Sequence, residues 1–142
     1  MDPESHGDLD ETMADIARQA GGSLHAYPRP GQAVRSIVLR DIHDDRGTQF
    51  EVAQIENDGT LRVMGHDTGP RVTEFFGDAI TNYEWVYVIA PERIDALLRM
   101  LGADHSDDAL AALAAYHQLN GGQISELLRG PEVAARFDNW PS

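Results

Sequence analysis

The side chains best suited to chemistry are the histidine and carboxylates of residues 41–45, which read Asp-Ile-His-Asp-Asp. Imidazole and carboxylate groups bind divalent metals. His43 and Asp45 could therefore form a site with His66 and Asp67, as in a small metal-dependent or acid/base enzyme. A solvated turn in an acidic protein is the simpler interpretation, because carboxylates on a turn have no fixed geometry. We therefore expect no bound metal and no cofactor.

Other kinds of catalytic site have little support in the sequence. The chain contains no cysteine, which excludes thiolate catalysis and cysteine-ligated zinc. It also lacks a G-x-S-x-G elbow, a P-loop and a G-x-G-x-x-G motif. His117 lies on the apolar stripe of a predicted helix, where a histidine bonded at the edge of the core is more common than a catalytic base. An enzyme is therefore the alternative hypothesis and not the leading one.

The charge of the chain indicates which partners it favours. The formal net charge is −13, and all 11 basic residues are arginine. Nucleic-acid affinity depends on neutralising phosphates with basic side chains, and the sequence has no basic cluster, so we expect no nucleic-acid partner. An acidic surface favours a protein partner with a basic surface, or serves solubility alone. The absence of lysine, with abundant Ala, Gly and Asp, is typical of high-GC bacterial coding.

Two acidic segments with aromatic residues nearby are the candidates for a protein interface. One lies around residues 41–45 and the other around residues 67–78. In an antiparallel meander, residues 65–67 return to the end of the sheet that carries the first turn. Carboxylates there would steer a basic partner, and aromatic side chains would anchor it. The candidate binding residues are Asp41, Asp44, Asp45, Asp67, Glu74, Phe76, Asp78 and Trp85.

Hydrophobic spacing and turn residues predict the elements that position these side chains. Residues 8–20 carry apolar residues at helical spacing and precede a Gly-Gly pair, which predicts an N-terminal helix. Residues 34–42, 48–56 and 60–64 are predicted strands, joined by the turns Asp-Asp-Arg-Gly and Asn-Asp-Gly. Two short turns make these strands an antiparallel meander. Residues 1–7 are polar, and we expect them to be disordered.

The second half of the sequence predicts one more strand and several helices. Residues 65–77 break the strand pattern, with a short helix that begins at Pro70. Residues 83–90 alternate between two faces and predict the fourth strand. From Pro91 onward the apolar spacing predicts only helices. We therefore expect a single α+β domain over residues 1–142. Its antiparallel sheet would have about four strands, with the N-terminal helix and the C-terminal helices packed against it.

One part of the sequence resembles a known family. Residues 65–70 read Gly-His-Asp-Thr-Gly-Pro, and residues 83–85 read Tyr-Glu-Trp. This Gly-x-Asp-x-Gly-Pro and Tyr-Glu-aromatic pattern is similar to that of a largely uncharacterised family of small acidic proteins from high-GC bacteria. Some of its members resemble immunity proteins that neutralise toxins. His66 stands where a small polar residue is more usual, and the helices after Gly102 lie outside the pattern. The resemblance implies a fold and an immunity-protein-like role, and it implies no catalytic residues.

The sequence also favours one compartment and one function. Residues 1–15 contain six carboxylates and no arginine, unlike the basic start of a signal peptide. No stretch approaches the roughly 18 apolar residues that a membrane span needs. We therefore expect a cytoplasmic protein without membrane association. The leading hypothesis is an acidic protein-binding module, such as an immunity protein or inhibitor that neutralises a basic partner.

Overall fold

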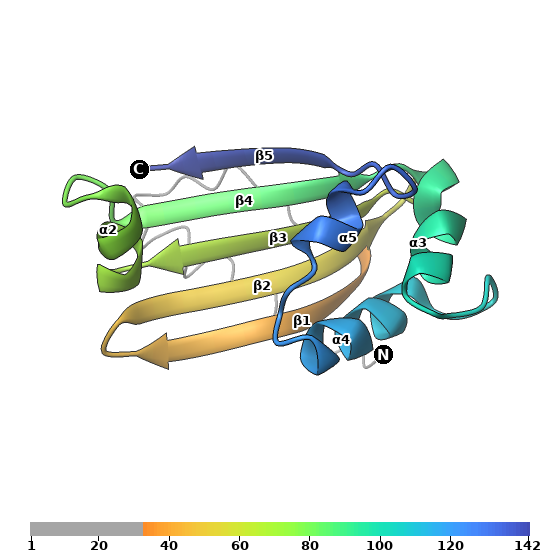
Figure 1. Cartoon of the computed structure of the whole chain (residues 1–142), viewed down its shortest axis with the longest axis horizontal. Coiled ribbons are helices and arrows are strands. Elements are labelled where there is room, and N and C mark those ends of the chain that lie inside the picture. Colours follow the sequence, from red (N-terminus) through yellow and green to blue (C-terminus); the bar gives the residue numbers. More distant parts are fainter. Residues whose placement is uncertain (1–32) are drawn as a thin grey trace.

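A five-stranded antiparallel sheet forms the centre of the described structure. The computed structural model describes residues 33–142, so the predictions of a disordered segment over 1–7 and a helix over 8–20 lie outside the described residues. The strands follow one another across the sheet in chain order (Figure 1). They are β1 Ala33–Asp44, β2 Gly47–Glu56, β3 Leu61–Thr68, β4 Asn82–Ile89 and β5 Arg136–Pro141. The α+β class is confirmed, and the sheet has five strands where about four were predicted.

The third strand is longer than predicted. β3 continues to Thr68 instead of ending at Met64. Residues 65–68 pair with β2 on one side and with β4 on the other, so the backbone hydrogen bonds of both neighbours hold this Gly-containing segment in the sheet. A glycine is also required there, because a Cβ atom at Gly65 would lie 2.2 Å from the indole ring of Trp85. The ring therefore lies directly over the strand.

The fifth strand is a correction to the sequence prediction, which expected only helices after Pro91. Arg136–Pro141 pairs with β4, with Phe137 opposite Tyr87 and Trp140 opposite Glu84. The two aromatic side chains pack on opposite faces of the sheet, since each joins a different core cluster. A short edge strand of this kind has little local signal, and its pairing with β4 decides its conformation.

The helices cover part of one face and one end of the sheet. In Figure 1 the C-terminal helices lie over the half of the sheet away from α2, and α2 lies at the opposite end. The predicted start of α2 at Pro70 is confirmed. No helix within residues 33–142 is long and apolar enough to cross a membrane. The helices are α2 Pro70–Phe76, the 3-10 helix η1 Pro91–Arg93, α3 Ile94–Met100, α4 Ala109–Leu119 and α5 Ser125–Arg129.

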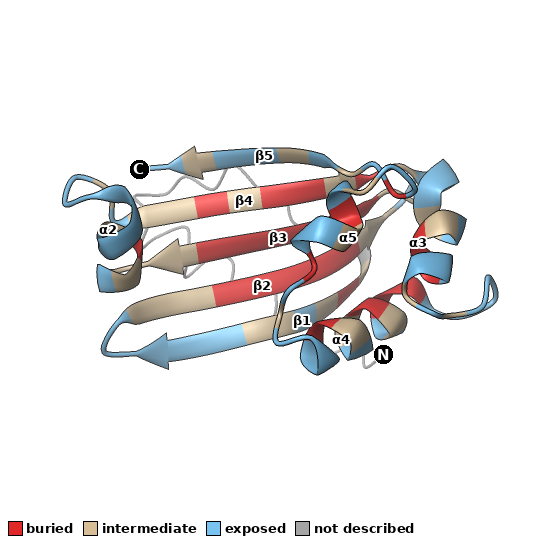
Figure 2. Ribbon diagram, in the orientation of Figure 1, coloured by how far each residue is buried: buried red, intermediate tan, exposed pale blue. Residues whose placement is uncertain are grey.

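The sheet carries a buried cluster on each face, as strand alternation requires. The larger cluster joins Val63, Tyr87 and Ile89 to residues of the C-terminal helices, such as Leu113 and Leu128. The smaller cluster consists of Phe50, Val52, Met64 and Val86. Figure 2 shows burial along the central strands, and exposure over α2 and over the C-terminal end of β1, residues 41–44. The packed core thus leaves the α2 end of the sheet as its most open part.

Candidate functional site

The acidic residues of the first predicted turn all lie at the surface. Asp41, Asp44 and Asp45 are exposed. Asp44 accepts a hydrogen bond from the backbone N–H of Arg46 at 2.9 Å and pairs with Arg71 at 3.0 Å. The hydrogen bond from Arg46, with the further help of Arg71, lowers the pKa of Asp44. Asp44 therefore holds the turn to α2, which leaves its charge largely compensated.

The second acidic segment lies at the same end of the sheet, as the meander predicted. Glu74 of α2 forms an ion pair with Arg46 of the β1–β2 turn, and Asp78 is exposed just after the helix. The backbone N–H of Arg71 also donates to the carbonyl oxygen of Arg46 at 3.0 Å. The two acidic segments, far apart in sequence, therefore meet where α2 packs against the first hairpin turn (Figure 1).

The four residues of the alternative enzyme hypothesis are not brought together. His66 is 1% exposed, and its neighbour Asp67 points to the opposite face of the sheet because strand residues alternate. His43 is exposed, and its Nε2 atom lies 3.1 Å from Oδ1 of Asp41. Among residues 33–142, no group of three or more His, Asp or Glu side chains is placed to hold a metal ion. Burial lowers the pKa of His66, against the opposing charge of Glu84, so a neutral imidazole is favoured there.

A hollow of about 290 Å³ lies between α2 and the neighbouring strands, and we call it the Asp67 hollow. Phe75 is 82% exposed at this hollow, and Phe76 is 37% exposed. The ring of Phe76 lies 4.8 Å from that of Phe75 and 4.8 Å from that of Tyr83. Of the helix residues only Val72 is buried. The lining residues are Gln49, Asp67, Arg71, Val72, Phe75, Phe76 and Tyr83.

Two residues of this hollow, Asp67 and Arg71, each have a buried polar atom without a hydrogen-bond partner among the described residues. Asp67 is the acidic one. Its Oδ1 atom is buried and has no hydrogen-bond partner among residues 33–142. Burial, followed by repulsion from Glu51, raises the pKa of Asp67 to about 6, although Arg71 and Arg40 oppose the shift. Burial also raises the pKa of Tyr83, so its phenol stays protonated. A carboxyl group with an unpaired buried oxygen therefore shares this hollow with the exposed rings of Phe75 and Phe76.

A second hollow of about 200 Å³ continues the site along the sheet, since Tyr83 lines both. Trp85, a predicted site residue, is half-buried here and packs edge-on against Tyr87 at 5.7 Å. The Tyr87 hydroxyl lies 2.9 Å from that of Ser125 in α5. The ring of Phe137 closes the group, 4.8 Å from Tyr87. Trp85 thus belongs partly to the core, and its ring forms a wall of the hollow and not a free anchor.

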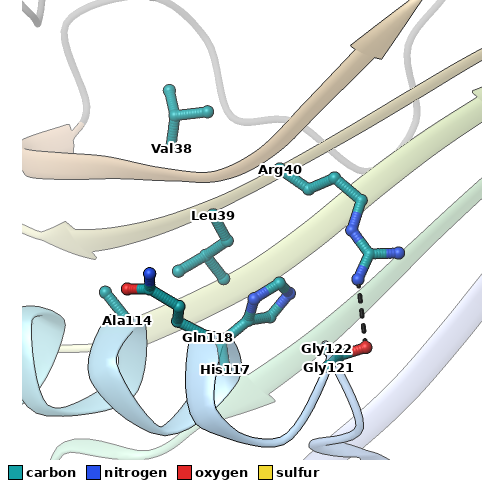
Figure 3. Close-up of a pocket in the computed structure, with 8 residues that line it drawn as sticks. All are labelled: Val38, Leu39, Arg40, Ala114, His117, Gln118, Gly121 and Gly122. Carbon is teal, nitrogen blue, oxygen red and sulfur yellow. Dashed lines mark hydrogen bonds between the residues drawn. The ribbon is translucent and has the colours of Figure 1, made fainter.

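A third hollow of about 410 Å³ lies between β1 and α4 (Figure 3). Nε2 of His117 is 2.9 Å from Oε1 of Glu51, and the Arg40 guanidinium is 3.6 Å from Oε2 of the same carboxylate. Arg40 also donates to the carbonyl oxygen of Gly121 at 3.2 Å, the bond drawn in Figure 3. Because Glu51 and His117 are buried and mutually satisfied, this cluster ties β1, β2 and α4 together.

Three residues of the site escaped the sequence prediction. Glu51, Arg71 and Phe75 had not been assigned to any site. Phe75 carried the only usable signal, because a short helix with two adjacent aromatic residues cannot bury both on one face. For Glu51 and Arg71 no local signal exists, since their partners are distant in the chain.

Comparison with known proteins found no match: no family model, no curated protein and no solved structure matches this chain. The resemblance of residues 65–70 and 83–85 to the immunity-protein-like family therefore stays a prediction.

Proposed function

We propose that this protein is a protein-binding module whose interface is centred on Phe75, Phe76 and Tyr83. We call these three residues the aromatic surface. The observation that carries the proposal is Phe75, which is 82% exposed beside the Asp67 hollow. A large apolar side chain in water gains free energy when a partner covers it, by roughly 25 cal/mol per Å² of buried area. Aromatic side chains beside a pocket are also common hot spots of protein interfaces.

The surroundings of the aromatic surface support a partner that is basic. The chain carries a net charge of −13, and Asp45 and Asp78 are exposed at the same end of the sheet as α2. Complementary charge raises association rates more than it raises affinity. The aromatic side chains would therefore supply the affinity and the carboxylates the rate. An inhibitor or immunity protein that covers a basic site of its target would bind in this way, with carboxylates that speed association and aromatic side chains that stabilise the complex.

The experiment compares two exposed side chains. Phe75→Ala removes the proposed anchor, and Leu119→Ala removes a residue that is 85% exposed at the end of α4, away from α2 in Figure 1. Both variants and the wild type are immobilised, and proteins captured from the native cell extract are identified and then purified. For the true partner, Phe75→Ala should weaken binding about 30-fold or more, as a hot-spot residue does. Leu119→Ala should bind as the wild type does.

The same comparison can refute the proposal. Phe75 is exposed, so its replacement should leave the folded state intact, which thermal unfolding can confirm. If a captured partner binds wild type and Phe75→Ala with the same affinity, the aromatic surface is not its interface. A partner lost equally in both variants would contradict the proposal as well, because the effect would not be specific to α2.

A further inference from the structure

We propose that the Asp67 hollow accepts a cationic side chain, a lysine or arginine, of the partner protein, with Asp67 as its counter-charge. This inference rests on the proposed function, because it names the group that the partner inserts beside Phe75. The geometry that supports it is a hollow of about 290 Å³ with aromatic residues and one carboxyl group in its lining. The buried Oδ1 of that carboxyl has no hydrogen-bond partner within the described chain.

An unpaired carboxyl in such a position needs an explanation. A buried polar atom without a partner destabilises the folded state, and buried carboxylates are normally paired. Glu51, on the neighbouring strand, shows the ordinary solution, because it has both His117 and Arg40 within 4 Å. Asp67 has no such close partner among residues 33–142. A cation brought by the partner would complete the site as His117 and Arg40 complete the site of Glu51.

The charged groups that act on Asp67 come from β1, β2 and α2, while the neighbouring strand β4 places the uncharged Tyr83 opposite it. Glu51 of β2 is the largest charge effect, and it is repulsive to a second carboxylate and attractive to a cation. Arg71 of α2 and Arg40 of β1 act in the opposite sense, each more weakly. Arg71 is also paired with Asp44 at 3.0 Å, and Arg40 with Glu51 at 3.6 Å. The buried Nη1 atom of Arg71 nevertheless has no hydrogen-bond partner among the described residues. A cationic side chain in the hollow would therefore be attracted by the carboxyl groups of Asp67 and Glu51 and repelled by Arg71, and the attraction of the two carboxyl groups carries the proposal.

The aromatic residues of the hollow favour a cation as well. The faces of aromatic rings attract ammonium and guanidinium groups. Phe75, Phe76 and Tyr83 line the hollow, and their rings follow one another at 4.8 Å spacings. Tyr83 stays uncharged, since its pKa is raised. An anion would be repelled by the carboxyl group of Asp67, although Arg71 lines the same hollow.

A cation in the hollow should make binding depend on pH with a defined sign. The pKa of Asp67 in the free protein is about 6, and a bound cation would stabilise the charged carboxylate. Only protein molecules with a charged Asp67 carboxylate are competent to bind the cation, so the apparent affinity falls as the fraction of these molecules falls. At pH 5 about a tenth of Asp67 is charged, so binding should be about tenfold weaker than at pH 8.

The test uses small probes that differ only in charge. The probes are titrated at constant ionic strength into the 142-residue chain labelled with ¹³C and ¹⁵N. They are N-acetyl-arginine amide, N-acetyl-lysine amide and the neutral N-acetyl-citrulline amide. We expect saturable shifts of the Asp67 carboxyl and of the Phe75, Phe76 and Tyr83 signals with a cationic probe. The citrulline probe should bind at least tenfold more weakly. The arginine and lysine arms show which cation fits better.

Variants separate this inference from the proposed function. Asp67→Asn should remove cationic probe binding and its pH dependence, while Asp45→Asn, an exposed carboxylate outside the hollow, should change neither. Equal binding of the citrulline and arginine probes would overturn the cation site, as would unaltered binding to Asp67→Asn. Partner binding that depends on Phe75 but not on Asp67 would leave the proposed interface standing without the cation. Partner binding that depends on neither residue would remove both.

Discussion

Two carboxylates on the same face of the sheet show how differently one protein can treat buried charge. Glu51 is 8% exposed and lies within 4 Å of both His117 and Arg40. Asp67 borders the Asp67 hollow without a close partner, and burial raises its pKa to about 6. The first arrangement stabilises the fold, whereas the second opposes folding at neutral pH. Strongly perturbed carboxyl groups of the second kind gather at functional sites.

This difference predicts that Asp67→Asn stabilises the protein at high pH. The folded pKa of Asp67 is raised above its ordinary value of 3.8, so the folded state binds a proton that the unfolded state releases. Its contribution to the free energy of unfolding therefore becomes less favourable as the pH rises from about 4 through about 6. A full shift would amount to about 3 kcal/mol, and partial exposure reduces this to about 2.

The measurement is urea unfolding of wild type and Asp67→Asn at pH 8 and at about pH 4. The asparagine variant should be the more stable one at pH 8, and the difference should nearly vanish at pH 4. Each comparison is made at a single pH, so the other titrating groups cancel. A stability difference of the same size at both pH values would show that Asp67 is not the buried, uncompensated group described above.

At the scale of elements, β5 forms the edge of the sheet beside β4 and contributes one aromatic side chain to the cluster on each face. Phe137 packs on the helix-covered face, 4.8 Å from Tyr87, with the Arg129 guanidinium 4.8 Å above its ring. Trp140 packs against the smaller cluster on the other face. The C-terminal residue Ser142 then exchanges backbone hydrogen bonds with Asn82, at 2.8 and 2.9 Å. β5 is thus held by side chains on both faces and by its backbone.

We predict that Phe137→Ala lowers the free energy of unfolding by about 2 kcal/mol, because a half-buried ring loses less than a fully buried one. Asn139→Ala, on the same strand and exposed, should stay within about 0.5 kcal/mol of wild type. Urea midpoints of both variants provide the measurement. If the two substitutions had the same small effect, β5 would not contribute to the packed core in solution.

At the scale of the whole molecule, some of the carboxylates near α2 are paired with arginine and others are exposed without such a pair. The arginines near α2 compensate Asp44 and Glu74, so steering of a partner falls to exposed carboxylates such as Asp45 and Asp78. The net charge of −13 acts over distances set by the Debye length, about 8 Å at 0.15 M salt. Long-range attraction therefore weakens with salt while short-range contacts persist.

We predict that association with the basic partner slows about tenfold or more between low and high salt, while dissociation changes much less. Stopped-flow association at several NaCl concentrations measures this dependence. The double variant Asp45→Asn with Asp78→Asn should associate more slowly at low salt and match the wild type at high salt. An association rate that stays constant from low to high salt would return the acidity to a role in solubility.

Much of the fold is encoded by neighbouring residues and could be predicted from the sequence. The structure confirms the Asn-Asp-Gly turn and the start of α2 at Pro70. It also confirms that the residues of the fourth strand alternate between the two faces of the sheet, because they join different core clusters in turn. The return of the second acidic segment to the end of the first turn, which follows from the meander alone, is confirmed as well. Each of these features depends on backbone preferences or on spacing within a few residues.

Only the tertiary structure decided the rest. β5 forms because β4 offers it hydrogen bonds and its two aromatic residues reach different clusters. The alternation of strand faces separates His66 from Asp67 and so leaves the predicted four-residue site unassembled. Whether a carboxylate gains close partners, as Glu51 does, depends on residues from β1 and α4. These outcomes require contacts between distant segments, whose free energies no local pattern in the sequence records.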